Sequence, residues 1–271
     1  MHKFPISIDT ALYLRYHYVN FHKGGRKMLT NKQIREKSRK DMTNKYGYAV
    51  LTTILLNLVL FGSGIAGFGL GAIVVVGAVM CCYTAFYIDI ALGKYNGIDS
   101  TYRGFRQFMR AFVATLLNLL INIGVCVAAG LLVLIYVGIL GGRVGDFAAI
   151  GLFVIAVAAI CVFVWVNVRL SMVYYVMNHN VNLSAMDCIK RSWEITKGHV
   201  WKIIGLKLSF LGWVILVVLT GGILGIYVMP YMGTADANLY LTLAYPDGNY
   251  PDIDENGEIK VAEEVVTEQL D

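Results

Sequence analysis

Long apolar runs dominate the pattern of hydrophobic and polar positions along this chain. The runs lie at about residues 47–61, 72–92, 113–140, 147–173, 200–219 and 222–243. A helix rises about 1.5 Å per residue, so about 20 apolar residues cross the hydrocarbon layer of a bilayer. Stretches such as 72–92 are apolar on every side, without the alternation that marks short barrel strands. The pattern therefore predicts an all-α membrane protein, a polytopic helical bundle of about six transmembrane helices.

The sixth run is less apolar than its neighbours. It contains Pro230, Gly233, Asp236 and Asn238. Proline and glycine are tolerated in membrane helices where neighbouring helices satisfy the freed backbone groups. We therefore predict a sixth span at 222–243, and the alternative is a segment that does not cross fully.

Basic amphipathic segments and glycine-rich turns divide the six runs into pairs. The turns near 62–71, 138–145 and 219–225 recur at intervals of about 80 residues, and such weak internal symmetry is typical of membrane proteins built by duplication. The sequence thus predicts three helical hairpins, each preceded by a basic amphipathic segment. The alternative is that any polytopic chain alternates spans and loops in this way.

Capping residues mark the basic segments as helices. Thr30 and Gln33 have the spacing of a capping box. Asp99 can cap a second helix and Ser184 a third, and Gly198 is placed to end the third helix. Each basic segment is therefore expected to form a short helix beside the membrane.

The two ends of the chain differ from its centre. Residues 1–27 do not continue the membrane pattern and lack the core of a signal peptide, which predicts an unstructured or spurious extension. A lipid-touching arm is the alternative for that stretch. Residues 28–244 form the predicted helical membrane domain. Residues 245–271 hold nine acidic residues and one lysine, a composition typical of a disordered tail.

Composition and charge agree with a membrane protein. Of 271 residues 57% are apolar and 15% charged, whereas soluble domains have about 45–50% and about 25%. The net charge of +5 comes from lysines and arginines beside the apolar runs, where topology and anionic lipid explain them. The expected partners are the lipid bilayer and anionic headgroups at the basic segments. The placement of the charge excludes nucleic acid, and the sequence identifies no protein partner.

The distribution of lysine and arginine predicts the orientation. Eleven precede the first run, four lie between 94 and 110, and four lie between 190 and 202, whereas Arg143 stands alone in the glycine-rich turns. By the positive-inside rule the N-terminus and the basic segments are cytoplasmic and the turns face outward. We expect a multi-pass protein of the plasma membrane.

Common catalytic and metal-binding motifs are absent from the sequence. It contains no HExxH, P-loop or GxSxG motif, and its five cysteines have no paired spacing. His179 and His199 lie at span ends without a ligand partner at suitable spacing, so we interpret them as interface histidines. We expect no disulfide, metal site or cofactor, and no residue supports an enzyme.

Polar residues inside the apolar runs are the remaining functional candidates, because ionisable groups are expensive there. They are Asp89, Lys207, Asp236, Asn57, Asn118, Asn122 and Asn167. Interhelical hydrogen bonds of about 0.6 kcal/mol each explain the asparagines most simply, and a solute pathway is the alternative. Asp89 lies about one turn from Lys94, so we interpret it as reaching the headgroups, with a proton site as the alternative.

Lys207 and Asp236 fall at matching depths if the last hairpin turns near Gly221 and Gly222. At about 1.5 Å per residue both would lie roughly 10 Å deep in antiparallel neighbours. An isolated charge near the membrane centre costs about 2.5–3.5 kcal/mol. We therefore expect the two side chains to pair. The alternative is that Lys207 reaches the headgroups and Asp236 lines a polar groove alone.

Five residues are predicted to lie at the membrane interface. They are Trp193, Trp201, Arg103, Arg106 and Arg110. Tryptophan is enriched at the boundary between membrane and water, and basic amphipathic helices lie in that plane.

The last third of the chain resembles a known family. The residues that carry the resemblance are Ser184, Ile189, Lys197, Gly198, His199 and Trp201, then SFLGW at 209–213, LTGGILG at 219–225, and Pro230 with Tyr231. Their order is similar to that of an uncharacterised bacterial membrane-protein family, domain of unknown function 975. The resemblance covers about 28–244 and is clearest over 184–240. It implies a multi-pass plasma-membrane protein and supplies no catalytic residues.

These observations favour a non-enzymatic membrane protein of unknown biochemical activity. It would organise or assist other envelope components through its cytoplasmic amphipathic segments. The alternative is a small transporter or channel for a solute or an ion, which would use the polar residues between spans. A membrane-embedded lipid enzyme is a third class, but it would need carboxylates or histidines clustered at one depth, and the sequence shows no such cluster.

Overall fold

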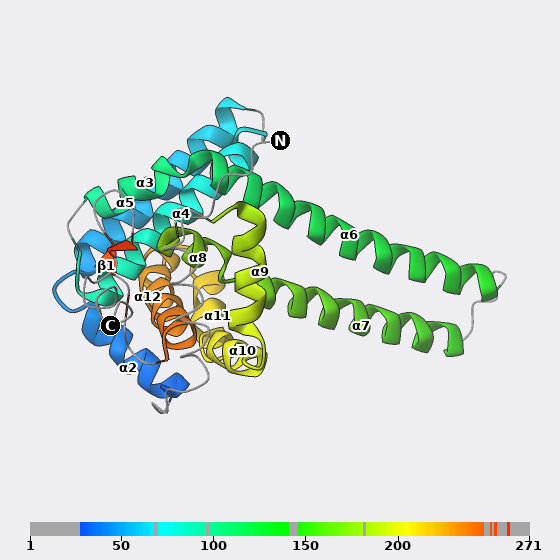
Figure 1. The fold of residues 1–271 in the computed structure, drawn as a ribbon. Helices are drawn as coiled ribbons and strands as arrows, with labels where there is room; N and C mark the ends of the chain where they lie inside the picture. Colours follow the sequence, from blue (N-terminus) through cyan, green and yellow to red (C-terminus); the bar gives the residue numbers. More distant parts are fainter. Residues whose placement is uncertain are drawn as a thin grey trace, which may run out of the picture.

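A computed structural model describes residues 28–67, 70–95, 98–140, 146–180, 183–246, 250, 252–253 and 259–260. The predicted extension at 1–27 lies outside these residues. The described chain is dominated by helices, which form a packed body from which one long helical pair protrudes (Figure 1).

The first helix of the described residues, α2 (Asn31–Asp41), begins at the predicted capping box. The backbone N–H of Gln33 donates to the hydroxyl of Thr30 at 3.3 Å, and the Thr30 N–H donates to the Gln33 side chain at 2.8 Å. These two bonds satisfy backbone groups that a helix start leaves unpaired. The inner face of α2 is buried at Ile34 and Ser38. This basic helix therefore packs into the body and does not lie on a surface alone.

Two helices, α3 (Tyr46–Ala66) and α4 (Leu70–Leu92), form the first packed pair. α3 continues beyond the predicted end at 61, through most of the stretch expected to turn. The turn is confined to the residues around Gly67, because Gly71 packs against the backbone of Ser63. A Cβ atom at Gly71 would lie 2.1 Å from the Ser63 carbonyl oxygen, so only glycine fits there.

The short helix α5 (Ile98–Arg106) leads into α6 (Phe108–Leu140) and α7 (Asp146–Leu170). α5 begins one residue before Asp99, and the predicted capping by the Asp99 side chain lies outside what the structure describes. α6 has 33 residues, which is about 50 Å at the rise of an α-helix. Figure 1 shows α6 and α7 side by side, with their far halves extending away from the body.

The chain returns to the body through α8 (Val173–His179) and α9 (Ala185–Thr196). The N–H of Asp187 donates to the Ser184 hydroxyl at 3.2 Å, as the sequence predicts for the cap of α9. Gly198 follows α9 with a φ of +81°, a backbone conformation that glycine adopts at little cost. Both ends of α9 are therefore confirmed.

The predicted fifth span is divided into α10 (Val200–Leu208) and α11 (Leu211–Leu219). The division falls at Ser209, whose hydroxyl donates to the Leu206 carbonyl at 2.6 Å. A serine that bonds to the preceding turn bends a helix in this way.

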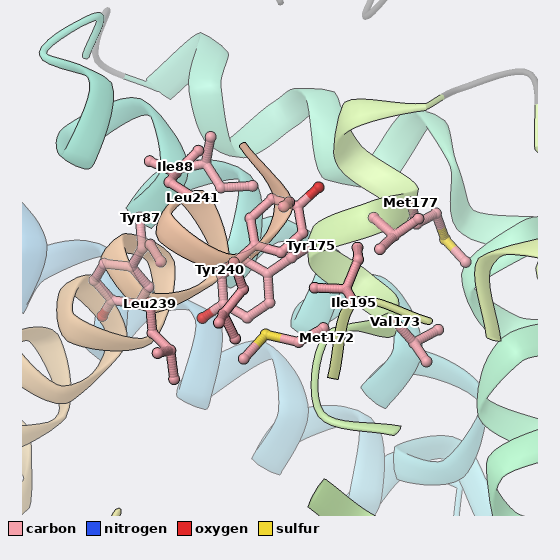
Figure 2. Packing of buried hydrophobic residues seen from close by; sticks show 14 of the residues in the cluster. Tyr87, Ile88, Met172, Val173, Tyr175, Met177, Ile195, Leu239, Tyr240 and Leu241 are labelled. Carbon is pink, nitrogen blue, oxygen red and sulfur yellow. The ribbon is translucent and has the colours of Figure 1, made fainter. Parts of the chain in front are cut away.

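The last helix, α12 (Gly225–Ala244), lies inside the body. Thirteen of its residues are buried, and it packs against α2, α3 and α4. Figure 2 shows Tyr240 of α12 and Tyr175 of α8 at the centre of the core, where their rings stack with centroids 5.3 Å apart. α12 is therefore a central element of the packed body.

Five helical stretches within the described residues are long and apolar enough to cross a membrane. They are Tyr46–Ala66, Gly71–Leu92, Phe108–Ile139, Ala149–His179 and Val200–Leu219. They correspond to five of the six predicted spans, and α12 is not among them. Its Asp236 and Asn238 lower its hydropathy, and the surrounding helices cover it where lipid would cover a span.

In the acidic tail, which the sequence predicts to be disordered, the structure describes two short strands. β1 (Asp252–Ile253) pairs antiparallel with β2 (Ile259–Lys260). The prediction of a disordered tail did not anticipate this strand pairing.

Candidate functional site

The predicted ion pair between Lys207 and Asp236 is present. The Lys207 ammonium on α10 donates to Asp236 Oδ2 on α12. The Lys207 side chain is 45% exposed and the Asp236 side chain 20% exposed. The pair therefore lies at the edge of the body and joins α10 to α12, so the alternative of two separate side chains is wrong.

A second polar contact ties α12 to α2. The Asn238 amide donates to the Ser38 hydroxyl at 3.0 Å and to Asp41 Oδ2 at 2.8 Å. Ser38 and Asn238 are both buried. Sequence reasoning marked Asn238 as unusual for a span but did not identify Ser38 or Asp41. The signal for Ser38 was its position one turn after Ile34, on the inner face of an amphipathic helix.

Asp89 is buried inside the protein, whereas the sequence interpretation has its side chain reaching the headgroups. Its carboxylate accepts a hydrogen bond from Arg103 of α5 at 2.8 Å, and the two side chains are 9% and 12% exposed. α5 can approach α4 closely because it carries Gly104. A Cβ atom there would lie 2.4 Å from the backbone nitrogen of Cys82. The helix that was predicted to lie on the membrane surface thus brings a guanidinium to a carboxylate inside the protein.

The three arginines predicted to lie at the interface have different surroundings. Arg103 and Arg110 are both partly buried, and Arg103 belongs to the pair just described. Arg110 donates to the carbonyl oxygen of Asn180 at 2.8 Å and also to that of Leu183. It holds the connection between α8 and α9 against the start of α6. Arg106 is exposed, as an interface residue would be.

Asn57 joins α3 to α4. Its amide donates to the Thr53 carbonyl at 2.8 Å and to the Tyr83 hydroxyl at 2.7 Å. The Tyr83 hydroxyl donates to the same carbonyl at 3.0 Å, and the Thr53 and Tyr87 hydroxyls lie 3.1 Å apart. Four side chains of two helices thus form one hydrogen-bond network, as interhelical bonding predicts.

The three asparagines of the long helical pair form a ladder. The Asn122 amide donates to Asn118 Oδ1 at 2.7 Å along α6. The Asn167 amide of α7 donates to Asn122 Oδ1 at 2.9 Å. The predicted interhelical bonding is confirmed for Asn122 and Asn167, and it fixes α6 against α7 where the pair leaves the body.

The two tryptophans predicted at the interface also differ. Trp201 is 85% exposed at the start of α10. Trp193 is half-buried and meets Trp165 edge to face, with centroids 5.3 Å apart. Arg169 lies over both rings, at 5.2 Å from Trp165 and 5.6 Å from Trp193, within the range of a cation–π interaction. Trp193 therefore anchors α9 to α7, and only Trp201 has the exposure of an interface residue.

His179 is fully buried, so its interpretation as an interface residue is wrong. Its Nδ1 lies 3.0 Å from the Tyr240 hydroxyl, and the two rings stack. Tyr245 meets the same imidazole edge to face at 5.4 Å. The histidine belongs to the aromatic centre of the core, where it joins α8 to the end of α12.

The polar groups are arranged as pairs between helices and not as one convergent cluster. Each of the seven intramembrane candidates forms at least one hydrogen bond or ion pair. In the described part of the chain no three His, Cys, Asp or Glu residues are grouped so that they could hold a metal ion. The geometry can thus neutralise charge and fix helices at specific registers, and it favours a structural use of these residues.

Comparison with known proteins identifies one family. The profile described as "Protein of unknown function (DUF975)" matches residues 28–245. No curated protein and no solved structure matches the chain. The matched region includes every helix from α2 to α12 and the pairs that join them, and the chain belongs to the DUF975 family.

Proposed function

We propose that this protein is a non-enzymatic, multi-pass membrane protein that organises or assists other components of the cell envelope. The observation that carries the proposal is the exposure of the α6–α7 pair. Within the most apolar windows of these two stretches, 0% and 6% of the residues are buried. Because so few residues of the α6–α7 pair are buried, its surface is available to lipid and to other membrane proteins.

Photo-crosslinking tests the proposal. A photoreactive amino acid replaces Phe153 of α7, whose side chain is 70% exposed, and cells are irradiated before solubilisation. We expect one or a few protein adducts, identified by mass spectrometry. A matched probe replaces the fully buried Phe86 of α4 and should yield only adducts within the chain. Lipid adducts alone at position 153 would contradict an assembly role for this surface.

The second candidate function is transport of a small solute or ion. It is favoured by the Lys207–Asp236 pair, because an ionisable pair at the edge of a bundle resembles the intramembrane groups of many transport pathways. Cells with Asp236→Asn at normal abundance would lose one flux and keep the others. An accessory role predicts unchanged uptake and a broad sensitivity to envelope stress in cells that lack the whole protein.

The proposal includes a location and an orientation. We infer that the protein lies in the plasma membrane with α2, α5 and α9 on the cytoplasmic side. The lysines and arginines of these helices support the inference, because positive charge is retained on that side.

A further inference from the structure

A cleft of about 490 Å³ opens between the end of α2 and the start of α3 on one side and α11 and α12 on the other. Four aromatic rings, two buried apolar side chains and one arginine line it. They are Tyr46, Trp213, Tyr227 and Tyr231, then Met42 and Val228, and Arg39, and Thr43 and Asn44 complete the lining. This volume is in the range that protein pockets use to enclose small ligands.

The cleft lies where polar and apolar parts of the chain meet. Tyr46 is the first residue of one candidate span, and Trp213 belongs to another. Arg39 is exposed on α2, a helix with five basic and two acidic residues. Tyrosine and tryptophan concentrate at the boundary between membrane and water. One side of the cleft therefore faces the acyl region of a bilayer and the other the charged surface.

The aromatic walls are held in place by contacts between distant elements. The Tyr46 hydroxyl donates to the Tyr227 carbonyl oxygen, and the two rings lie 4.5 Å apart. Tyr231 meets Phe210 edge to face with centroids 5.3 Å apart. These contacts join α3, α11 and α12, so the cleft is formed before any ligand arrives.

The chemistry of the lining selects an amphiphile with a negative head. A guanidinium presents a planar fork that suits phosphate oxygens, and the surrounding positive charge of α2 favours an anion. The aromatic rings suit a chain of methylene groups. We propose that this cleft binds an anionic phospholipid, with the phosphate at Arg39 and the upper part of an acyl chain against Trp213 and Tyr227. This binding site goes beyond the proposed accessory role and does not depend on it.

Quenching of tryptophan fluorescence by brominated lipid tests the proposal. The purified full chain is placed in nanodiscs of phosphatidylcholine that contain increasing fractions of brominated phosphatidylglycerol. The difference in quenching between the unsubstituted protein and Trp213→Phe measures lipid binding in the cleft. We expect half-maximal quenching at a severalfold lower fraction of brominated phosphatidylglycerol than of brominated phosphatidylcholine.

Two charge variants of α2 distinguish lipid binding in the cleft from general attraction of anionic lipid to the basic surface. Arg39→Gln should raise the half-maximal fraction about thirtyfold, because it removes a charged hydrogen bond as well as a surface charge. Lys40→Gln removes the same charge beside the cleft, from a residue that does not line it. It should raise the fraction about fivefold at most. Arg39→Lys keeps the charge without the fork and should fall between them.

Three results would overturn the proposal. Equal shifts for Arg39→Gln and Lys40→Gln would show a diffuse surface effect. Equal quenching by the two brominated lipids would show an annular contact without headgroup selection. Reversal of the quenching by millimolar glycerol phosphate would show a site for a soluble phosphate. The melting temperature of each variant in the same nanodiscs confirms that the fold is retained.

Discussion

Polar side chains in the apolar regions of this protein are used to join helices. Lys207 meets Asp236, Asn167 meets Asn122, and Asn57 meets Tyr83, each across a helix pair. An unpaired polar group in such surroundings loses water without compensation, so each pair specifies one register between its helices. This use explains why a chain without convergent catalytic groups still carries ionisable residues inside its helices.

A double-mutant cycle on Lys207 and Asp236 tests the pair. Lys207→Met and Asp236→Leu should each destabilise the protein by about 1–3 kcal/mol, because each leaves one charge without its partner. The lower part of this range applies to Asp236→Leu, since the remaining Lys207 is nearly half exposed. The double variant should recover much of the loss. The measurement is thermal unfolding in detergent, and purely additive losses would show that the two residues act independently.

The Asp89–Arg103 pair predicts a contrast between two arginines of α5. Arg103→Gln should lower the free energy of unfolding by about 3 kcal/mol, because the buried carboxylate loses a charged partner. Arg106→Gln removes the same charge from an exposed position of the same helix and should cost about 1 kcal/mol at most, because interactions of exposed charges contribute little. Unfolding is followed by tryptophan fluorescence in denaturant. Equal losses for the two variants would show that the Asp89–Arg103 pair stabilises the fold no more than an exposed charge does.

At the scale of elements, features that depend on neighbouring residues were predictable. The caps at Thr30 and Ser184 and the glycine end at Gly198 follow from short local patterns, and the structure confirms them. Partners far apart in sequence were not predictable. Asp89 pairs with Arg103 of the next helix, because α5 folds back onto α4 at Gly104. That fold-back depends on tertiary packing, which hydropathy does not encode.

α9 is an amphipathic helix that packs into the core, and the reactivity of its cysteine measures this burial. Burial raises the pKa of the Cys188 thiol to about 11, so the thiol is almost entirely protonated at neutral pH. We predict that N-ethylmaleimide leaves Cys188 unmodified in native membranes at pH 7.5 and modifies it after unfolding. A cysteine at Lys190, an exposed position of the same helix, should react fully. Peptide mass spectrometry measures both, and rapid modification of native Cys188 would show that α9 leaves the body.

At the scale of the whole molecule, the class was predictable and the role of the last helix was not. Hydropathy identified five candidate spans because each is a continuous apolar run. It also suggested a sixth at 222–243, whereas α12 is covered by protein through contacts with α2, α3 and α4. Hydropathy does not show which other helices pack against a given helix, so the contacts of α12 do not follow from its sequence. The packing of other helices around α12 was therefore apparent only from the structure.

The orientation of the whole molecule yields the final prediction. Lysine and arginine cluster in α2 and at the ends of α9, whereas the connection between α3 and α4 lacks them. The positive-inside rule then places Ser63 near the outer surface and Lys190 in the cytoplasm. In intact cells a membrane-impermeant maleimide should modify Ser63→Cys and leave Lys190→Cys unmodified until the cells are opened.

Ser192 is unsuitable as the inner reporter, because it is buried and its hydroxyl donates to the Arg169 carbonyl. The unsubstituted protein sets the background, since Cys81, Cys82 and Cys188 are buried and Cys126 and Cys161 lie within candidate spans. Labelling of Lys190→Cys but not of Ser63→Cys from outside would reverse the orientation, and α2 with its aromatic cleft would then face the exterior.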